Sequence, residues 1–129
     1  MDKSILLDAN AVLRYLLDDV HDQHQTVKEA IESKNCVCIL STIQEVVYVL
    51  ENYYHVPRKA IANALLPLKD LTEIEDEDVF VSALRYYLET PKIDFADCIM
   101  CGYRTNRDID ILTFDKKLEK KLNSLKLHV

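Results

Sequence analysis

The chain is poor in the residues that build turns and linkers. Its 129 residues include one glycine and three prolines, and they show no repeat and no low-complexity tract. A single glycine cannot supply a glycine-rich phosphate loop, and no G-x-S-x-G stretch offers a serine nucleophile. Because 49% of the residues are hydrophobic and linker material is scarce, we expect one domain over residues 1–129.

Long apolar runs are also missing. The run at residues 5–7 is too short for a signal peptide, and acidic residues flank it. No segment approaches the roughly 20 apolar residues that a membrane-spanning helix needs. We therefore expect a cytoplasmic protein without a membrane partner.

Cysteine and histidine are few. Without a secretory signal, the close pairs Cys36 with Cys38 and Cys98 with Cys101 do not suggest disulfides. Both pairs lie in apolar stretches, so buried reduced thiols are expected rather than a zinc site. The histidines are scattered, and those at positions 21 and 24 lie in a polar segment that indicates a solvated face.

The net charge of −6 argues against a general nucleic-acid-binding protein. The distribution is uneven, however. Residues 104–129 hold seven basic and four acidic side chains, a net charge of +3, which leaves −9 on the rest of the chain. This basic quarter could hold a phosphate chain locally, or its lysine-rich stretch at 116–121 could be only a solvated helix face.

Short apolar runs alternate with helical patterns along the chain. Buried strands are predicted at residues 5–7, 37–40 and 109–113, and a short strand at 72–75. The helices are predicted at residues 11–17, 22–34, 43–54, 57–68, 75–90, 95–105 and 115–125. The fifth of these opens with four acids, which suit a helix N-terminus. The alternation predicts an α/β fold with a parallel sheet and helices on both faces.

Carboxylates follow the predicted strands. Asp8 comes directly after the first strand, Glu45 lies shortly after the second, and Asp115 follows the strand that ends near residue 113. Asp94 and Asp97 begin the helix before that last strand, one turn apart on one face. Because ligands of such sheets bind beyond the carboxyl ends of the strands, we expect these acids to converge.

Each acid also has a purely structural interpretation. The acids that follow strands could cap helices, and Glu45 could complete a capping box with Thr42. Glu45 precedes an apolar stretch, so part of its surroundings should be apolar. Capping explains Asp94 well and Asp97 poorly. In addition, two like charges one turn apart repel each other unless a cation lies between them. All-oxygen ligation favours Mg²⁺ or Mn²⁺, and such a site suits phosphodiester hydrolysis.

Four stretches match, in order, the motifs of a known family. The sequence resembles PIN-domain ribonucleases over nearly its whole length, and among them the VapC-type toxins of prokaryotic toxin–antitoxin pairs. The matching stretches are LLDANAVLRYLLDD, STIQEVVYVLE, DFADCIM and ILTFDKKL. The resemblance implies a twisted parallel β-sheet sandwiched by α-helices, often in a homodimer.

The resemblance also implies Mg²⁺- or Mn²⁺-dependent endonucleolytic cleavage of RNA, and a cognate antitoxin as protein partner. The catalytic, metal-binding acids would be Asp8, Glu45, Asp97 and Asp115. Asp94 would be an auxiliary acid at the metal. The groups that orient these acids would be Asn10, Thr42 and Thr113. Basic side chains that either contact the RNA backbone or are merely solvated are Arg14, Arg104, Lys116 and Lys117.

Two further functions fit the sequence. The acidic body suits a non-catalytic interaction module with a PIN fold, and the acids equally suit a PIN nuclease that acts on DNA or in RNA processing. Several tyrosines offer aromatic surface for an antitoxin or a dimer, unless they pack between helices. They are Tyr48, Tyr53, Tyr54, Tyr86 and Tyr87.

Overall fold

The computed structural model describes residues 3–33 and 35–125, and the chain divides into two compact units. Unit 1 is Met1–Glu75 and unit 2 is Asp76–Val129. Among the described residues, every helix is too short or too polar to span a membrane. Each unit has its own architecture.

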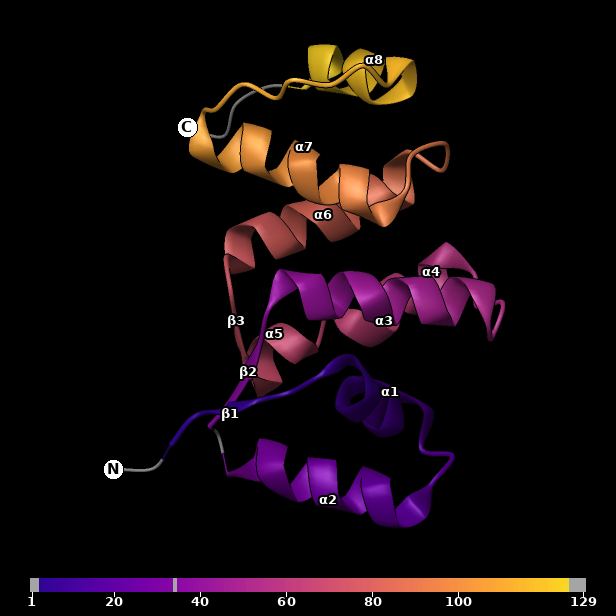
Figure 1. The fold of residues 1–129 in the computed structure, drawn as a ribbon, viewed down its shortest axis with the longest axis vertical. Helices are drawn as coiled ribbons and strands as arrows, with labels where there is room; N and C mark the ends of the chain where they lie inside the picture. Colours follow the sequence, from indigo (N-terminus) through magenta and orange to yellow (C-terminus); the bar gives the residue numbers. More distant parts are fainter. Residues whose placement is uncertain (1–2, 34, 126–129) are drawn as a thin grey trace. The chain divides into compact units, whose positions relative to one another are not determined.

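Unit 1 contains a parallel sheet in the strand order β1-β2-β3 (Figure 1). The strands are β1 (Ile5–Leu6), β2 (Cys36–Cys38) and β3 (Glu73–Ile74). Ile5 lies opposite Cys36, and Val37 lies opposite Glu73. The predicted strands at 5–7, 37–40 and 72–75 are confirmed as shorter strands, and β2 begins one residue earlier than predicted. The predicted burial of the first strand is wrong, since Ile5 and Leu6 are 41% and 60% exposed. The α/β class with a parallel sheet is confirmed as well.

Helices make up the rest of unit 1. They are α1 (Ala9–Leu17), α2 (His21–Glu32), α3 (Leu40–Asn52), α4 (Arg58–Leu65) and α5 (Leu68–Leu71). The single helix predicted over 57–68 is divided, because Pro67 has no N–H to donate and its ring crowds the preceding turn. The helix predicted from residue 43 begins earlier, at Leu40.

The core of unit 1 follows helical spacing. In α3 the fully buried Ile43 and Val46 and the nearly buried Leu50 recur at intervals of three and four residues. Val12 of α1 and Ile31 of α2 are buried in the same way, and α1 contacts both α2 and α3. The amphipathic pattern of the sequence therefore identifies the buried faces correctly.

His24 corrects one prediction in unit 1. Its ring stacks on Tyr15, with centroids 5.5 Å apart and planes 8° from parallel. Its Nδ1 lies 3.0 Å from the carbonyl oxygen of Tyr15. His24 therefore packs α2 against the end of α1, and the predicted solvated face holds only for His21, which is exposed.

The described part of unit 2 contains the helices α6 (Glu77–Glu89), α7 (Phe95–Arg107) and α8 (Lys116–Ser124) (Figure 1). Helices α6 and α7 form an antiparallel pair. Arg107 at the end of α7 bonds to Asp76 just before α6, at 3.0 Å. At the other end, the rings of Tyr87 and Phe95 meet edge to face, with centroids 5.5 Å apart. These contacts span the full length of the pair.

The only glycine of the sequence has a packing role in this helix pair. A Cβ atom on Gly102 would lie 2.8 Å from the carbonyl oxygen of Val79 and 3.0 Å from its Cγ1. Residue 102 must therefore lack a side chain for α6 and α7 to approach this closely. Left-handed backbone conformations occur at other residues, which tolerate them less well than glycine does: Asp18, His55, Asp76 and Asp108.

The tyrosines divide into two groups. Tyr86 and Tyr87 are buried in α6, and the Tyr86 hydroxyl donates to Thr105 Oγ1 at 3.1 Å. For these two, helix packing is the correct interpretation. The tyrosines at positions 48, 53 and 54 are exposed, with 64%, 79% and 44% of their surface accessible.

The strand predicted at 109–113 is wrong for the structure described here. Residues 108–115 form no helix and no strand, and Leu112 and Phe114 are 91% and 90% exposed. A strand needs a neighbour for its N–H and C=O groups, and the described part of unit 2 (76–125) contains none. The apolar composition of residues 109–113 was therefore not sufficient to make them a strand.

The cysteine prediction holds. All four cysteine side chains are buried. Burial raises the pKa of the Cys101 thiol to about 11, so this side chain stays protonated at neutral pH. The thiols act as small apolar groups of the core.

Candidate functional site

Three of the candidate acids are helix N-caps. Asp8 Oδ1 accepts the N–H of Ala11 at 2.8 Å, and Asp94 Oδ1 accepts the N–H of Asp97 at 2.9 Å. Asp115 Oδ1 accepts two amide hydrogens at the start of α8, at 2.9 and 3.1 Å. The capping interpretation is therefore correct for all three. Capping also holds each carboxylate in a defined place at the start of its helix.

Asp97 differs from these caps. It lies in the first turn of α7, is partly buried, and uses only its backbone N–H in the capping bond to Asp94. Burial raises the pKa of its carboxyl, and the negative charges of Asp94 and Asp115 raise it further. Asp97 therefore lies close enough to Asp94 and to Asp115 for their charges to act on its carboxyl, as the spacing of Asp94 and Asp97 suggested.

Thr113 contacts the backbone of Asp115. Its hydroxyl oxygen accepts the backbone N–H of Asp115 at 3.1 Å. The segment before α8 is thereby tied to the cap of that helix. The predicted orienting role of Thr113 has a structural contact to support it, although its effect on activity stays a prediction.

Glu45 lies in α3 and is exposed. The capping box with Thr42 is not formed. Because α3 begins at Leu40, Thr42 is an interior helical residue, and it is buried. A different acid satisfies the start of the helix: Glu75 Oε1 accepts the N–H of Leu40 at 3.1 Å.

Sequence reasoning missed this role of Glu75. We assigned it to the acids that open the helix after it, but α6 begins at Glu77. Instead, the N–H of Glu75 donates to the carbonyl of Cys38 at 2.9 Å and continues the pairing of β2 with β3. The available signal was its position at the end of the strand predicted at 72–75, next to the start of a helix.

The candidate acids are divided between the units. Asp8 and Glu45 belong to unit 1, whereas Asp94, Asp97 and Asp115 belong to unit 2 and form what we call the acid cluster. Within residues 3–33 and 35–125, no group of three or more His, Cys, Asp or Glu side chains is arranged to hold a metal ion. The acid cluster has the all-oxygen donors and the mutual repulsion that a divalent cation would relieve, but it is not by itself a complete ligand shell.

The predicted basic contacts have different surroundings. Arg14 is largely buried and donates to both carboxylate oxygens of Asp19, at 2.8 and 3.0 Å. Lys116 is 90% exposed and lies 3.8 Å from Glu119. Asn10 is exposed in the first turn of α1. Arg14 is thus engaged within unit 1 and is a weak candidate for an RNA contact.

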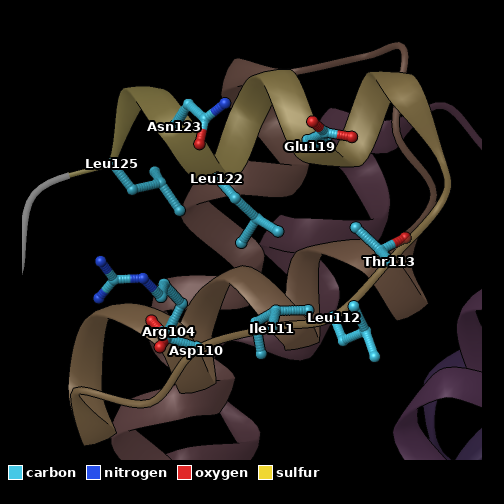
Figure 2. Close-up of a pocket in the computed structure, with 9 residues that line it drawn as sticks. All are labelled: Arg104, Asp110, Ile111, Leu112, Thr113, Glu119, Leu122, Asn123 and Leu125. Carbon is cyan, nitrogen blue, oxygen red and sulfur yellow. The ribbon is translucent and has the colours of Figure 1, made fainter.

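Arg104 lines a cavity of about 480 Å³ in unit 2 (Figure 2). The cavity lies between α7, the segment before α8, and α8 itself. Figure 2 shows Arg104 beside Asp110, with Thr113 farther along the same segment and Glu119 on the opposite helix. One arginine therefore shares the cavity with two acids, so this cavity is not a basic surface.

Comparison with known families gives a match over almost the whole chain. The model of the PIN domain matches residues 5–121, from β1 into α8. A search of curated proteins and a search of solved structures each found no significant match. The candidate acids all fall within the matched residues, and PIN domains are generally metal-dependent nucleases. Since the match runs through both units and includes the parallel sheet and the acid cluster, the chain belongs to the PIN domain family.

Proposed function

We propose that this protein is a Mg²⁺- or Mn²⁺-dependent endoribonuclease. The observation that carries the proposal is the crowding of carboxylates at Asp97, in a chain whose family generally consists of metal-dependent nucleases. Repulsion of this kind is costly in a folded protein unless a cation offsets it. The proposed ligands are Asp8, Glu45, Asp97 and Asp115, with Asp94 as an auxiliary acid.

The proposed ligands all lie within the residues that the PIN domain model matches. The family match over residues 5–121 supports one nuclease domain that includes Asp8 and Glu45 as well as the acid cluster. The caps at Asp8 and Asp115 hold two of the ligands at helix starts. Asn10 and Thr42, each close in sequence to a ligand, would help to orient their neighbours. Thr113, whose hydroxyl accepts the backbone N–H of Asp115, would do the same for Asp115.

The chemistry follows from the charges. A bound divalent cation supplies activation of a water molecule and neutralises charge that develops on the phosphate. The carboxylates of the chain would hold the cation, and their negative charge would repel competing anions. A cation held there would offset the charges of Asp94 and Asp115 and so favour the charged form of Asp97. In the hydrolysis a water oxygen bonds to phosphorus while the bond to the leaving ribose oxygen breaks. The water gives up one proton to solvent and the leaving oxygen takes one up, so that the strand ends in a phosphate and a hydroxyl group.

Cleavage of a labelled RNA tests the proposal. We expect cleavage with added Mg²⁺ or Mn²⁺, none in EDTA, and a loss of at least about 100-fold in Asp97→Asn and in Asp8→Asn. The matched control is Asp108→Asn, because Asp108 is an exposed acid outside the proposed site and asparagine also tolerates its left-handed backbone. Equal activity in Asp8→Asn and the wild type would contradict the assignment.

Two other readouts separate the alternatives. Titration calorimetry with Mn²⁺ should show binding that is lost in Asp97→Asn, whereas a non-catalytic interaction module requires no such site. Competition between RNA and DNA of the same sequence distinguishes an endoribonuclease from a DNA nuclease. Preferential cleavage of DNA would move the protein to that second class.

We also propose that the protein is the toxin of a type II toxin–antitoxin pair, acting in the cytoplasm as a homodimer with a VapC-like role. The exposed tyrosines at 48, 53 and 54, near the end of α3, support a protein-binding surface there. Co-expression with the neighbouring small gene product should give a complex with reduced cleavage. Failure of that product to co-purify would contradict the antitoxin, and a monomer in sedimentation would contradict the dimer.

A further inference from the structure

A second hollow in unit 2 has a different character from the cavity at Arg104. It encloses about 400 Å³ between the turn that precedes α7 and one side of α8. We call it the lysine cleft, after the basic side chains that line it: Lys92, Lys117, Lys120 and Lys121. Hydroxyl groups of Thr90 and Ser124 complete its polar lining.

The lysine cleft has no acid among its described lining residues. The ion pairs described for unit 2 occupy other cations, namely Arg107 with Asp76 and Asp78, and Lys116 with Glu119. Four lysine side chains therefore line one hollow that has no carboxylate among its described lining residues, in a chain of net charge −6. Such a concentration of positive charge favours a bound anion.

Helix α8 presents these lysines on one side. Lys120 and Lys121 lie three and four residues after Lys117, and Ser124 lies four and three residues after them, which is the spacing of one helix face. Lys121 is partly buried, and its Nζ lies 5.2 Å from the centre of the Tyr86 ring, a cation–π contact that holds the side chain in place. The neighbouring Lys116 instead is almost fully exposed. A merely solvated face would not hold a lysine against a buried ring.

Residues of the lysine cleft are close in sequence to the acid cluster, both before α7 and at the start of α8. Lys92 precedes Asp94 by two residues, and Lys117 follows Asp115 by two. The link at α8 is direct, since the backbone N–H of Lys117 donates to Asp115 Oδ1 at 2.9 Å. A phosphate chain bound in the cleft would therefore continue to the carboxylates proposed to act on it.

We propose that the lysine cleft binds the phosphate backbone of single-stranded RNA next to the acid cluster. This inference rests on the proposed function and deepens it, because it assigns the part of the substrate that each face of unit 2 contacts. A hollow of about 400 Å³ accommodates one nucleotide unit of a flexible strand rather than the side of a duplex. Contacts to phosphates make the binding dependent on salt and independent of base sequence.

The test measures binding without cleavage. The full-length protein is titrated into a fluorescent 20-nucleotide RNA in EDTA, and anisotropy gives the affinity at several salt concentrations. We compare wild type with Lys117→Gln/Lys120→Gln, and with the control Lys28→Gln/Lys59→Gln. Both pairs are exposed and remove the same charge, but the control pair lies in unit 1 on α2 and α4.

We expect the cleft variant to bind roughly tenfold more weakly at moderate salt and to lower the slope of log K against log salt by about 1.4, since each lost contact to a single strand contributes about 0.7. The control variant should match the wild type. An unchanged slope in the cleft variant would overturn the proposal, even if Asp97→Asn abolishes cleavage. Conversely, a wild type that cleaves nothing leaves this binding result unaffected.

Competitors identify the ligand. Unlabelled RNA should displace the probe from the wild type, whereas inorganic phosphate at the same total phosphate concentration should not. Displacement by inorganic phosphate would overturn the assignment to a chain. Displacement by poly-glutamate of equal charge, as effective as RNA, would overturn the assignment to RNA and identify an acidic protein segment as the ligand.

Discussion

Unit 1 and unit 2 hold their candidate acids in different surroundings. In unit 1, Asp8 and Glu45 are exposed and belong to separate helices. In unit 2, the acid cluster surrounds a partly buried Asp97, whose pKa is raised by burial and by its two acidic neighbours. Exposure to water stabilises an isolated carboxylate, whereas crowding and burial do the opposite. Without a cation, the acids of unit 2 are therefore the ones that lower the free energy of unfolding.

The sign of that cost follows from the direction of the shift. Below the ordinary pKa of 3.8, Asp97 is protonated in both the folded and the unfolded chain and contributes nothing. Between 3.8 and the raised value, the unfolded chain loses this proton first, so the free energy of unfolding falls as the pH rises. Above the raised value the full penalty is present.

The largest expected effect tests whether the two units unfold separately. Ile61 of unit 1 and Phe80 of unit 2 are completely buried. We expect Ile61→Ala to cost about 2–5 kcal/mol and Phe80→Ala about 3–5 kcal/mol, because each leaves a cavity. If residues 1–129 form one cooperative domain, each substitution lowers a single transition in urea, followed by circular dichroism. A second transition that only one substitution moves would contradict the single domain.

Gly102→Ala is expected to have the next largest effect, and it acts on unit 2. The new Cβ would meet the Val79 carbonyl oxygen at 2.8 Å, so α6 and α7 must separate slightly. Overpacking of this kind costs about 1–3 kcal/mol. Urea denaturation measures it, with Ala64→Ser as a control at an exposed position of α4. A variant as stable as the wild type would show that the helix pair is looser than described.

Asp97→Asn should separate stability from activity. In EDTA at pH 7 we expect it to raise the unfolding midpoint, because the substitution removes the repelled charge, while cleavage is lost. Asp8→Asn should leave stability nearly unchanged, since asparagine is as good an N-cap as aspartate. The gain in Asp97→Asn should shrink as the pH falls toward 3.8. Lower stability of Asp97→Asn at pH 7 would contradict the crowding of the acid cluster.

The smallest effect concerns an acid of unit 2 that is shifted in the opposite direction. Hydrogen bonding to Arg107 lowers the pKa of Asp78, so its stabilising effect is complete above 3.8 and is lost as the pH falls through the lowered value. Arg107→Gln should lower stability slightly at pH 7 and not at strongly acidic pH, because exposed ion pairs contribute little. Equal losses at both pH values would point to packing rather than charge.

Sequence reasoning succeeded where the interacting residues are close in the chain and failed where they are distant. The helix starts at Asp8, Asp94 and Asp115 depend on bonds to amides within three residues, and these acids were recognised as capping candidates from sequence. The failures involve distant partners. Glu75 bonds to Leu40 across 35 positions, and the apolar segment at 109–113 is not a strand because strand formation depends on a neighbour.

By itself, the sequence determined the α/β class, the short strands, most helices and the identity of the acids, because amphipathic spacing and capping are local. Tertiary structure alone decided which acid is crowded: Asp97 feels Asp115 only because α8 packs against α7. It also decided which tyrosines are buried and which lysines gather around a cleft. Burial and charge repulsion depend on distances in space, and spacing along a chain does not fix them beyond one or two helical turns.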